Sequence, residues 1–440
     1  MNPTRQILPK ALGIGALTTT MVAALVLATG CGATCERIET DRRQFFARKP
    51  TGGTHIEMII PFATVERLAL PQIAAIKPIA LPIPNLGKLS EYFGDLTIVP
   101  TRVSFKPAAA DHIGFHLDFE VRRNDRKAFT MYMETDVKPT IDIENRKIVL
   151  GFTPDALQKA RVKFSKDAVD DLSAIIYEQI PSVARFLIPQ SMVEKAAASA
   201  VEMLTDTLYS KLKGKMLPKL AASSSVEIAL PRIPLSEVHI TSSLKGNGRL
   251  RLAITTALPV EAGIDEAAAA KTEPSTESVT LRVSGAAAAE LVNWAMAEKL
   301  IAFRYDRNGK SSPDGELRPG LAWARGEERA MKIYLWDLEK PCMRLTMSAR
   351  PSIAVADGKL EIKAEDAEND DIEASAFTKV GTWFYLLWKD PMHLDKKSDA
   401  VINLTAGEKE LKIIVKKASV EKDELIFEVR PILDNAASAR

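Results

Sequence analysis

The stretch Ile113-Gly-Phe-His-Leu-Asp-Phe-Glu-Val121 alternates apolar and polar residues without interruption. A period of two places all the apolar side chains on one face of an extended strand and all the polar ones on the other. Such a strand buries one face against a core while its other face meets water. The pattern therefore predicts an antiparallel sheet that covers an apolar interior.

The same alternation continues along the chain. Phe129, Met131 and Met133 repeat it, and the Asn145-Arg146 turn separates two further short apolar runs. We therefore expect successive antiparallel strands from residue 97 to residue 152. Before them, residues 62–75 have the apolar spacing of a helix, although Pro71 interrupts the pattern.

A helical region is predicted from Thr153 to about Lys219, with breaks near Pro181 and Pro189. Residues 192–212 form its clearest amphipathic part, because apolar residues recur there at helical spacing on one face. That stripe consists of Val193, Ala196, Ala197, Ala200, Val201, Leu204, Leu208 and Leu212. Strand alternation then resumes near Val226 and near Leu250.

Residues 259–277 are rich in Ala, Glu, Thr, Ser and Pro and lack an apolar stripe, so they are predicted to be a linker. Beyond them the organisation begins again, with a strand at 279–283, Ser284 as an N-cap and a helix at 286–300. Alternating strands follow almost to the end. The predicted domains are residues 54–258 and 278–440.

The N-terminus has the order of a secretory signal peptide, with a basic start, an apolar run and small residues before Cys31. It resembles a bacterial lipoprotein signal, which implies removal of residues 1–30, lipidation of Cys31 and a tether over residues 31–53. Gly32, rather than Asp, implies an outer-membrane anchor that faces the periplasm. The alternatives are ordinary secretion and an uncleaved helix, since ~18 apolar residues approach the length that spans a bilayer.

The remaining cysteines are Cys35 and Cys342. If Cys31 carries lipid, these two are free to pair in an oxidising compartment and to join the N-terminal segment to the second half of the chain. Two unpaired thiols are the alternative.

The run Val279-Thr-Leu-Arg-Val-Ser-Gly285, followed by the alanine-rich helix up to Trp294, is similar to the opening of tubular lipid-binding (TULIP) domains. That superfamily includes the bactericidal/permeability-increasing protein. The resemblance covers residues 54–435 as two tandem units. It implies an α+β fold, in which two curved antiparallel sheets are each wrapped around a long amphipathic helix. The disulfide of the vertebrate members has no counterpart, because residues 54–258 contain no cysteine.

The resemblance also implies an apolar groove for a lipid or another long apolar ligand. Methionine and aliphatic side chains suit such a groove, because they adapt to flexible ligands. The candidate lining residues are Phe115, Leu117, Phe119, Met131, Met133, Val193, Ala197, Val201, Leu204, Leu208, Leu291, Val292 and Met296. The alternative is a structural lipoprotein that binds an envelope protein and fills its interior with these same side chains.

Other functions find little support in the sequence. Lys and Arg total 59 against 57 Asp and Glu, so no uniform charge attracts nucleic acid. No nucleophile-elbow or phosphate-loop motif is present, and we expect neither catalysis nor a cofactor. His112 and His116 would lie about 13 Å apart on a strand, too far for one metal ion. The acidic run at residues 365–373 lacks the EF-hand spacing and is predicted to be a solvated loop.

Overall fold

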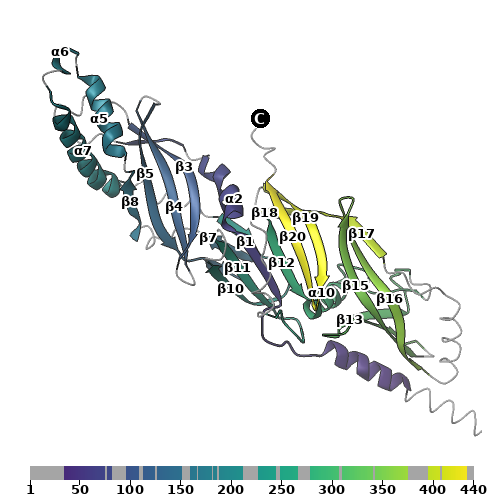
Figure 1. The fold of residues 1–440 in the computed structure, drawn as a ribbon. Coiled ribbons are helices and arrows are strands. Elements are labelled where there is room, and N and C mark those ends of the chain that lie inside the picture. The colour runs from purple at the N-terminus through teal and green to yellow at the C-terminus, as the bar shows by residue number, and fades with distance from the viewer. Residues whose placement is uncertain are drawn as a thin grey trace, which may run out of the picture.

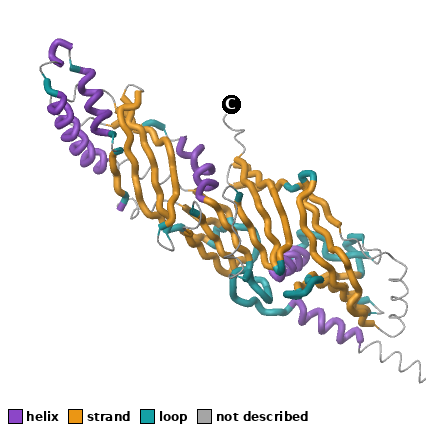
Figure 2. Tube along the Cα trace, in the orientation of Figure 1, coloured by secondary structure: helices purple, strands orange, loops and turns teal. Residues whose placement is uncertain are grey.

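The computed structural model shows an elongated molecule, with strands along most of its length and a group of helices at one end (Figure 1; Figure 2). The structure describes residues 34–74, 77–81, 96–108, 112–123, 126–150, 159–165, 167–180, 182–185, 188–211, 226–243, 248–265, 278–306, 310–339, 342–374, 395–406 and 409–433.

The middle of the molecule is an antiparallel sheet built from both halves of the chain. Its spatial order is β10 (Leu235–Ser243), β11 (Arg249–Thr256), β1 (Ile56–Pro61), β12 (Val279–Ser284), β20 (Glu424–Leu433), β19 (Lys409–Glu421) and β18 (Val401–Ala406). Strand β1 pairs with β11 on one side and with β12 on the other. The predicted domains on either side of residues 259–277 therefore share this central sheet.

The first half contributes a second antiparallel sheet, in the order β2 (Ile79–Leu81), β3 (Leu96–Pro107), β4 (Ile113–Arg123), β5 (Arg126–Val137) and β8 (Arg161–Phe164). In β4 the apolar positions are buried and the polar ones between them are half-buried, as the alternation predicts. A small sheet contains β6 (Thr140–Asp142), β7 (Lys147–Leu150) and β9 (Val226–Ala229).

The helices of the first half are α2 (Phe62–Ala74), α5 (Ala168–Gln179), α6 (Ser182–Arg185) and α7 (Gln190–Lys211). α7 matches the predicted amphipathic helix and packs on α5 and β8 at one end of the molecule. One part of the helical prediction is wrong, because residues 161–164 form strand β8. Its Phe164 lies opposite Met131 of β5 and packs against the apolar interior.

The second half adds helix α10 (Gly285–Ala297) and a further antiparallel sheet. Ser284 caps α10, because its side chain accepts a hydrogen bond of 3.1 Å from the amide of Ala287. The sheet has the order β13 (Leu317–Trp323), β14 (Met331–Asp337), β15 (Met343–Ala356), β16 (Lys359–Ala374) and β17 (Asp395–Asp399). The fold class is therefore α+β with antiparallel sheets, as predicted.

Two local predictions are wrong. The acidic run at residues 365–373 is part of β16 rather than a loop, because its carboxylates pair with cations of neighbouring strands: Asp371 lies 3.3 Å from Arg344. Residues 34–46 form a helix, called here the N-terminal helix, rather than a tether. Its apolar residues cover aromatic side chains of β14, as described below.

Candidate functional site

One face of the central sheet is apolar from β10 to β19. A single row crosses it, in which each residue lies directly opposite the next: Ile240, Leu252, Met58, Leu281, Phe427 and Ala418. Residues opposite one another in an antiparallel pair share a face and touch. We call this surface the central apolar face. It joins the two halves of the chain without a polar interruption in this row.

Some side chains of this row are buried and others are partly exposed. Leu252 is 1% exposed, whereas its neighbours Met58, Leu281 and Phe427 are only partly buried. Phe427 packs against both the large apolar core, which includes residues of both halves, and a smaller core beside β15 and β19. The adjacent apolar side chains of Met58, Leu281 and Phe427 therefore retain surface that a ligand can cover.

The sequence did not single out these three residues as a site. The signal that identifies them is the alternation within their strands, Ile56-Met58-Ile60, Val279-Leu281-Val283 and Leu425-Phe427-Val429. Alternation predicts which face of each strand is apolar, but it contains no information on which strands become neighbours. That pairing involves residues more than 200 positions apart, such as Met58 and Leu281.

The predicted groove residues of the first sheet lie together in the large core. Phe119 is opposite Met131, and Leu117 is opposite Met133; these four and Phe115 are all buried. Their near-complete burial means that neighbouring side chains already surround them. They form the wall of the interior rather than an open surface.

The predicted helical groove residues divide into two groups. On α7, Val193 and Ala197 are buried in the large core and Val201 packs against it; the side chains of Leu204 and Leu208 lie outside the described residues. On α10, Leu291 packs against the same core, Met296 is buried and Val292 is half-buried. Cys31 also lies outside the described residues.

The opposite face of the central sheet carries a line of four alternating charges, of which Glu57, Arg282 and Glu424 are buried. Arg282 on β12 lies directly opposite Glu57 on β1, and its Nη1 donates to Glu57 Oε2 at 2.9 Å. The same guanidinium donates through Nε to Glu424 on β20, also at 2.9 Å. Arg251 on β11 binds the other side of Glu57. We call these four residues the charge ladder; it ties strands of both halves together.

His55, at the start of β1, is fully buried in the part of the structure that is described. Its Nδ1 accepts a hydrogen bond of 3.0 Å from the amide of Thr256. Burial lowers the pKa of His55, because the charged imidazolium loses its hydration inside the protein.

The free energy of unfolding is therefore expected to decrease as the pH falls below about 6.5, the pKa of an exposed histidine. In that window the unfolded chain takes up the proton and the folded chain resists it. His55→Asn, whose side-chain oxygen replaces Nδ1 as the acceptor, is expected to flatten this pH dependence. Urea unfolding between pH 5 and 8 measures both slopes; equal slopes would rule out His55 as the origin.

The N-terminal helix is fastened to the second half of the chain. Cys35 and Cys342 form a disulfide, with 5.2 Å between their Cα atoms. One turn further along, Ile38 is fully buried beside Trp336. Phe45 then packs on Trp336, with ring centroids 5.2 Å apart. The helix therefore closes over the aromatic part of β14.

Ion pairs run alongside this packing. Arg344 on β15 binds Asp41 of the N-terminal helix at 3.0 Å and Glu373 of β16 at 2.9 Å. Arg37 of the helix also pairs with Glu373. Residues 31–53 were predicted to be a tether because they are polar and basic. In the structure, the charged side chains of the N-terminal helix form ion pairs with the sheet, and its apolar side chains pack on the aromatic rings of the sheet.

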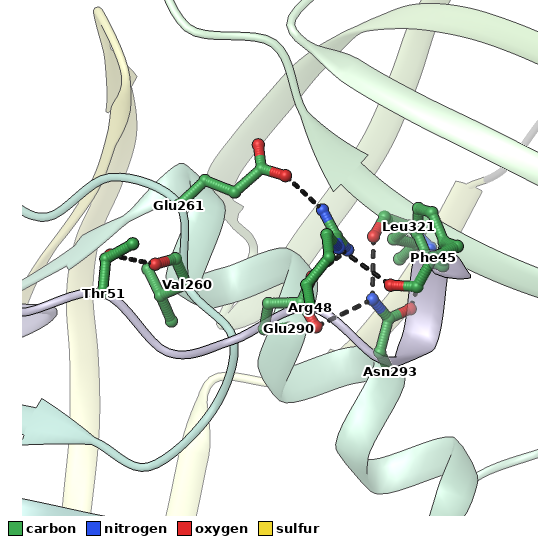
Figure 3. A network of polar contacts seen from close by, with 8 residues as sticks. All are labelled: Phe45, Arg48, Thr51, Val260, Glu261, Glu290, Asn293 and Leu321. Atoms are coloured by element: carbon green, nitrogen blue, oxygen red, sulfur yellow. Dashed lines mark hydrogen bonds and ion pairs between the residues drawn. The ribbon is translucent and has the colours of Figure 1, made fainter. Parts of the chain in front are cut away.

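Arg48, two residues beyond the N-terminal helix, lies at a junction with α10 and β13 (Figure 3). It binds Glu261 at 2.6 Å and Glu290 of α10 at 2.5 Å. Asn293, one turn along α10, exchanges hydrogen bonds of 2.8 Å with the backbone of Leu321 on β13. Burial raises the pKa of Glu290, and the Arg48 guanidinium opposes that rise. The junction fixes α10 relative to the N-terminal helix and β13.

The polar face of the first sheet carries a chain of pairs rather than a metal site. His116 lies 3.0 Å from Asp118 and 3.3 Å from Glu134. Within the described residues no group of three or more His, Cys, Asp or Glu is arranged to hold a metal ion. In the same part of the chain, no helix has both the length and the hydropathy that crossing a membrane requires.

No protein-family model and no curated protein matches the chain. Among solved structures it is similar to P47 from Clostridium botulinum A2, at 9% identity and a TM-score of 0.36, over 88% of this chain and 99% of that chain. It is also similar to a lipopolysaccharide binding protein, at 10% identity and a TM-score of 0.24, over 87% of this chain and 100% of that chain. Neither likeness is close enough to indicate function.

Proposed function

We propose that this chain is a lipid-anchored envelope protein of TULIP-like architecture, which binds or carries a lipid or another long apolar ligand on its central apolar face. It acts without catalysis, and its anchor is a lipidated Cys31 in the outer membrane, facing the periplasm. The observation that supports binding is the partial exposure of Met58, Leu281 and Phe427, three adjacent apolar residues of the central apolar face. An extended apolar surface of this kind suits an acyl chain.

A specific observation also favours the alternative, a structural lipoprotein that binds an envelope protein and fills its own interior. Leu117, Phe119 and Met131 are at most 1% exposed, so the first sheet leaves them no free surface. The two functions therefore differ in what occupies the space beside Leu281: a ligand or the protein itself.

Leu281→Trp distinguishes the two functions. If a ligand occupies the space beside Leu281, the larger ring fills it, the free energy of unfolding changes by less than about 1 kcal/mol, and lipid uptake is lost. If protein atoms fill that space, overpacking costs about 1–3 kcal/mol. Urea unfolding measures stability; native mass spectrometry of the protein from its own membrane, and uptake of a fluorescent fatty acid, measure binding.

Leu252→Trp is the matched control, because Leu252 lies in the same row and is closed by its neighbours. It should destabilise the protein whichever function is correct. If the unmodified protein contains no co-purifying acyl species and takes up no fluorescent lipid, the proposed function is wrong.

A further inference from the structure

Helix α10 ends in a turn that backbone hydrogen bonds hold in place. The amide of Leu300 donates to the carbonyl of Ala295 at 2.8 Å, and the amide of Lys299 donates to that of Met296 at 3.1 Å. Lys299 has φ 59°, in the left-handed region. This is the Schellman arrangement, in which glycine is usual at the position of Lys299. The residues that follow are therefore held in one direction.

Those residues are apolar and face outward. Leu300 is 64% exposed and Ile301 is 40% exposed. In a Schellman turn the residue at the position of Leu300 commonly packs back onto its own helix. Here that side chain is mostly exposed, although the hydrogen bonds of the turn are made. Adjacent exposed apolar residues on a fixed turn are typical of an interaction surface.

Two cations of the same loop lie beside its aromatic residue, Phe303. Lys299 and Arg304 each lie 5.8 Å from the centre of the Phe303 ring. Behind them, burial and the neighbouring cations Arg304 and Arg42 lower the pKa of Arg318. The carboxylates of this region are Glu298 and Asp306 beside the loop, Asp314 and Glu316 on the segment that pairs with it, and Glu39 on the N-terminal helix. Apolar residues bordered by lysine and arginine match the acyl boundary and anionic headgroups of a bilayer.

The N-terminal helix connects this loop to the anchored end of the chain. Tyr305, directly after the loop, exchanges backbone hydrogen bonds of 3.0 and 2.9 Å with Leu317 of β13, and Arg48, two residues beyond the helix, binds Glu290 of α10. The helix is described from Thr34, three positions after Cys31, and the disulfide holds its first turn to the second half of the chain. A lipid on Cys31 would therefore attach the chain to a membrane from the same half of the molecule as residues 299–304.

We propose that residues 299–304, the membrane loop, insert Leu300 and Ile301 into the headgroup–acyl boundary of an anionic bilayer, with Lys299 and Arg304 at its phosphates. This inference rests on the anchored part of the proposed function and is independent of cargo. The loop is a second contact besides the anchor, and it fixes which side of the molecule faces the membrane.

The test uses the full chain with its acyl anchor, reconstituted into vesicles of phosphatidylethanolamine and phosphatidylglycerol. A Leu300→Cys variant carries the polarity-sensitive fluorophore NBD. We expect a blue-shifted emission that a quencher in the acyl region reduces, and a smaller shift when phosphatidylcholine replaces phosphatidylglycerol or when salt is raised. Lys299→Gly, which preserves the left-handed turn and removes the cation, should also reduce the shift.

Met192→Cys is the matched control, since Met192 is also 64% exposed but lies on α7, at the other end of the molecule. The unsubstituted chain measures any labelling of native thiols. Water-like emission at position 300 in a chain that floats with the vesicles overturns the membrane loop and leaves the cargo proposal intact. An equal blue shift at position 192 also overturns it. Failure of the chain to float overturns the anchor and the loop together.

Discussion

Arg282→Met is expected to reduce the free energy of unfolding by about 3–5 kcal/mol, because it breaks a buried ion pair from one side only. Arg282 is 2% exposed, and its guanidinium serves both Glu57 and Glu424. Without it, two buried carboxylates remain, and the partly exposed Arg251 binds one of them, Glu57. Urea unfolding followed by circular dichroism measures the loss in both halves of the chain.

Two comparisons identify the cause. Arg350→Met removes an arginine that binds Asp366 at 3.0 Å on the protein surface, and it should cost less than about 1 kcal/mol. Replacing Glu57, Arg282 and Glu424 together by Leu, Met and Leu should recover most of the lost stability, since no unpaired charge stays buried. A loss below about 1 kcal/mol for Arg282→Met would show that the charge ladder does not stabilise the central sheet.

The strands and α7 were predictable because they depend on local pattern. Alternation around Phe115 fixes one face of β4, and the stripe that includes Val193 fixes one face of α7. The central sheet was not predictable in the same way. Glu57 and Arg282 are ordinary polar residues within alternating strands, and only their pairing across 225 positions makes them a buried ion pair.

The candidate site was likewise only partly predictable. Sequence pattern identified apolar positions such as Leu117 and Met133, which turn out to be closed by their neighbours. It did not identify Leu281, whose partial exposure depends on what β1 and β20 place beside it. The N-terminal helix was missed because its stabilising partners, Trp336 and Glu373, are about 300 positions away.

Cys35→Ser is expected to cost about 2–5 kcal/mol, because the disulfide closes a loop between residues 307 positions apart and removes much of the unfolded chain's freedom. The loss should be concentrated at the N-terminal helix, which the disulfide holds at its first turn. Hydrogen exchange of residues 34–46 should therefore accelerate. The emission of Trp336, which is 1% exposed under Phe45 and Ile38, should shift to the red.

The control for this change is Cys342→Ser, which should lower the free energy of unfolding by the same amount. The double variant should cost no more than either single one, because all three remove the same bond.

Ile38→Ala tests the packing separately: it should cost about 2–5 kcal/mol with the disulfide intact. If exchange of residues 34–46 stays slow in Cys35→Ser, packing and ion pairs alone hold the helix. If it accelerates, the disulfide holds the helix, and it then also sets the distance between the proposed acyl anchor and the proposed membrane loop. The NBD signal at position 300 should then weaken in the same variant, since a released helix lets the body turn away from the bilayer.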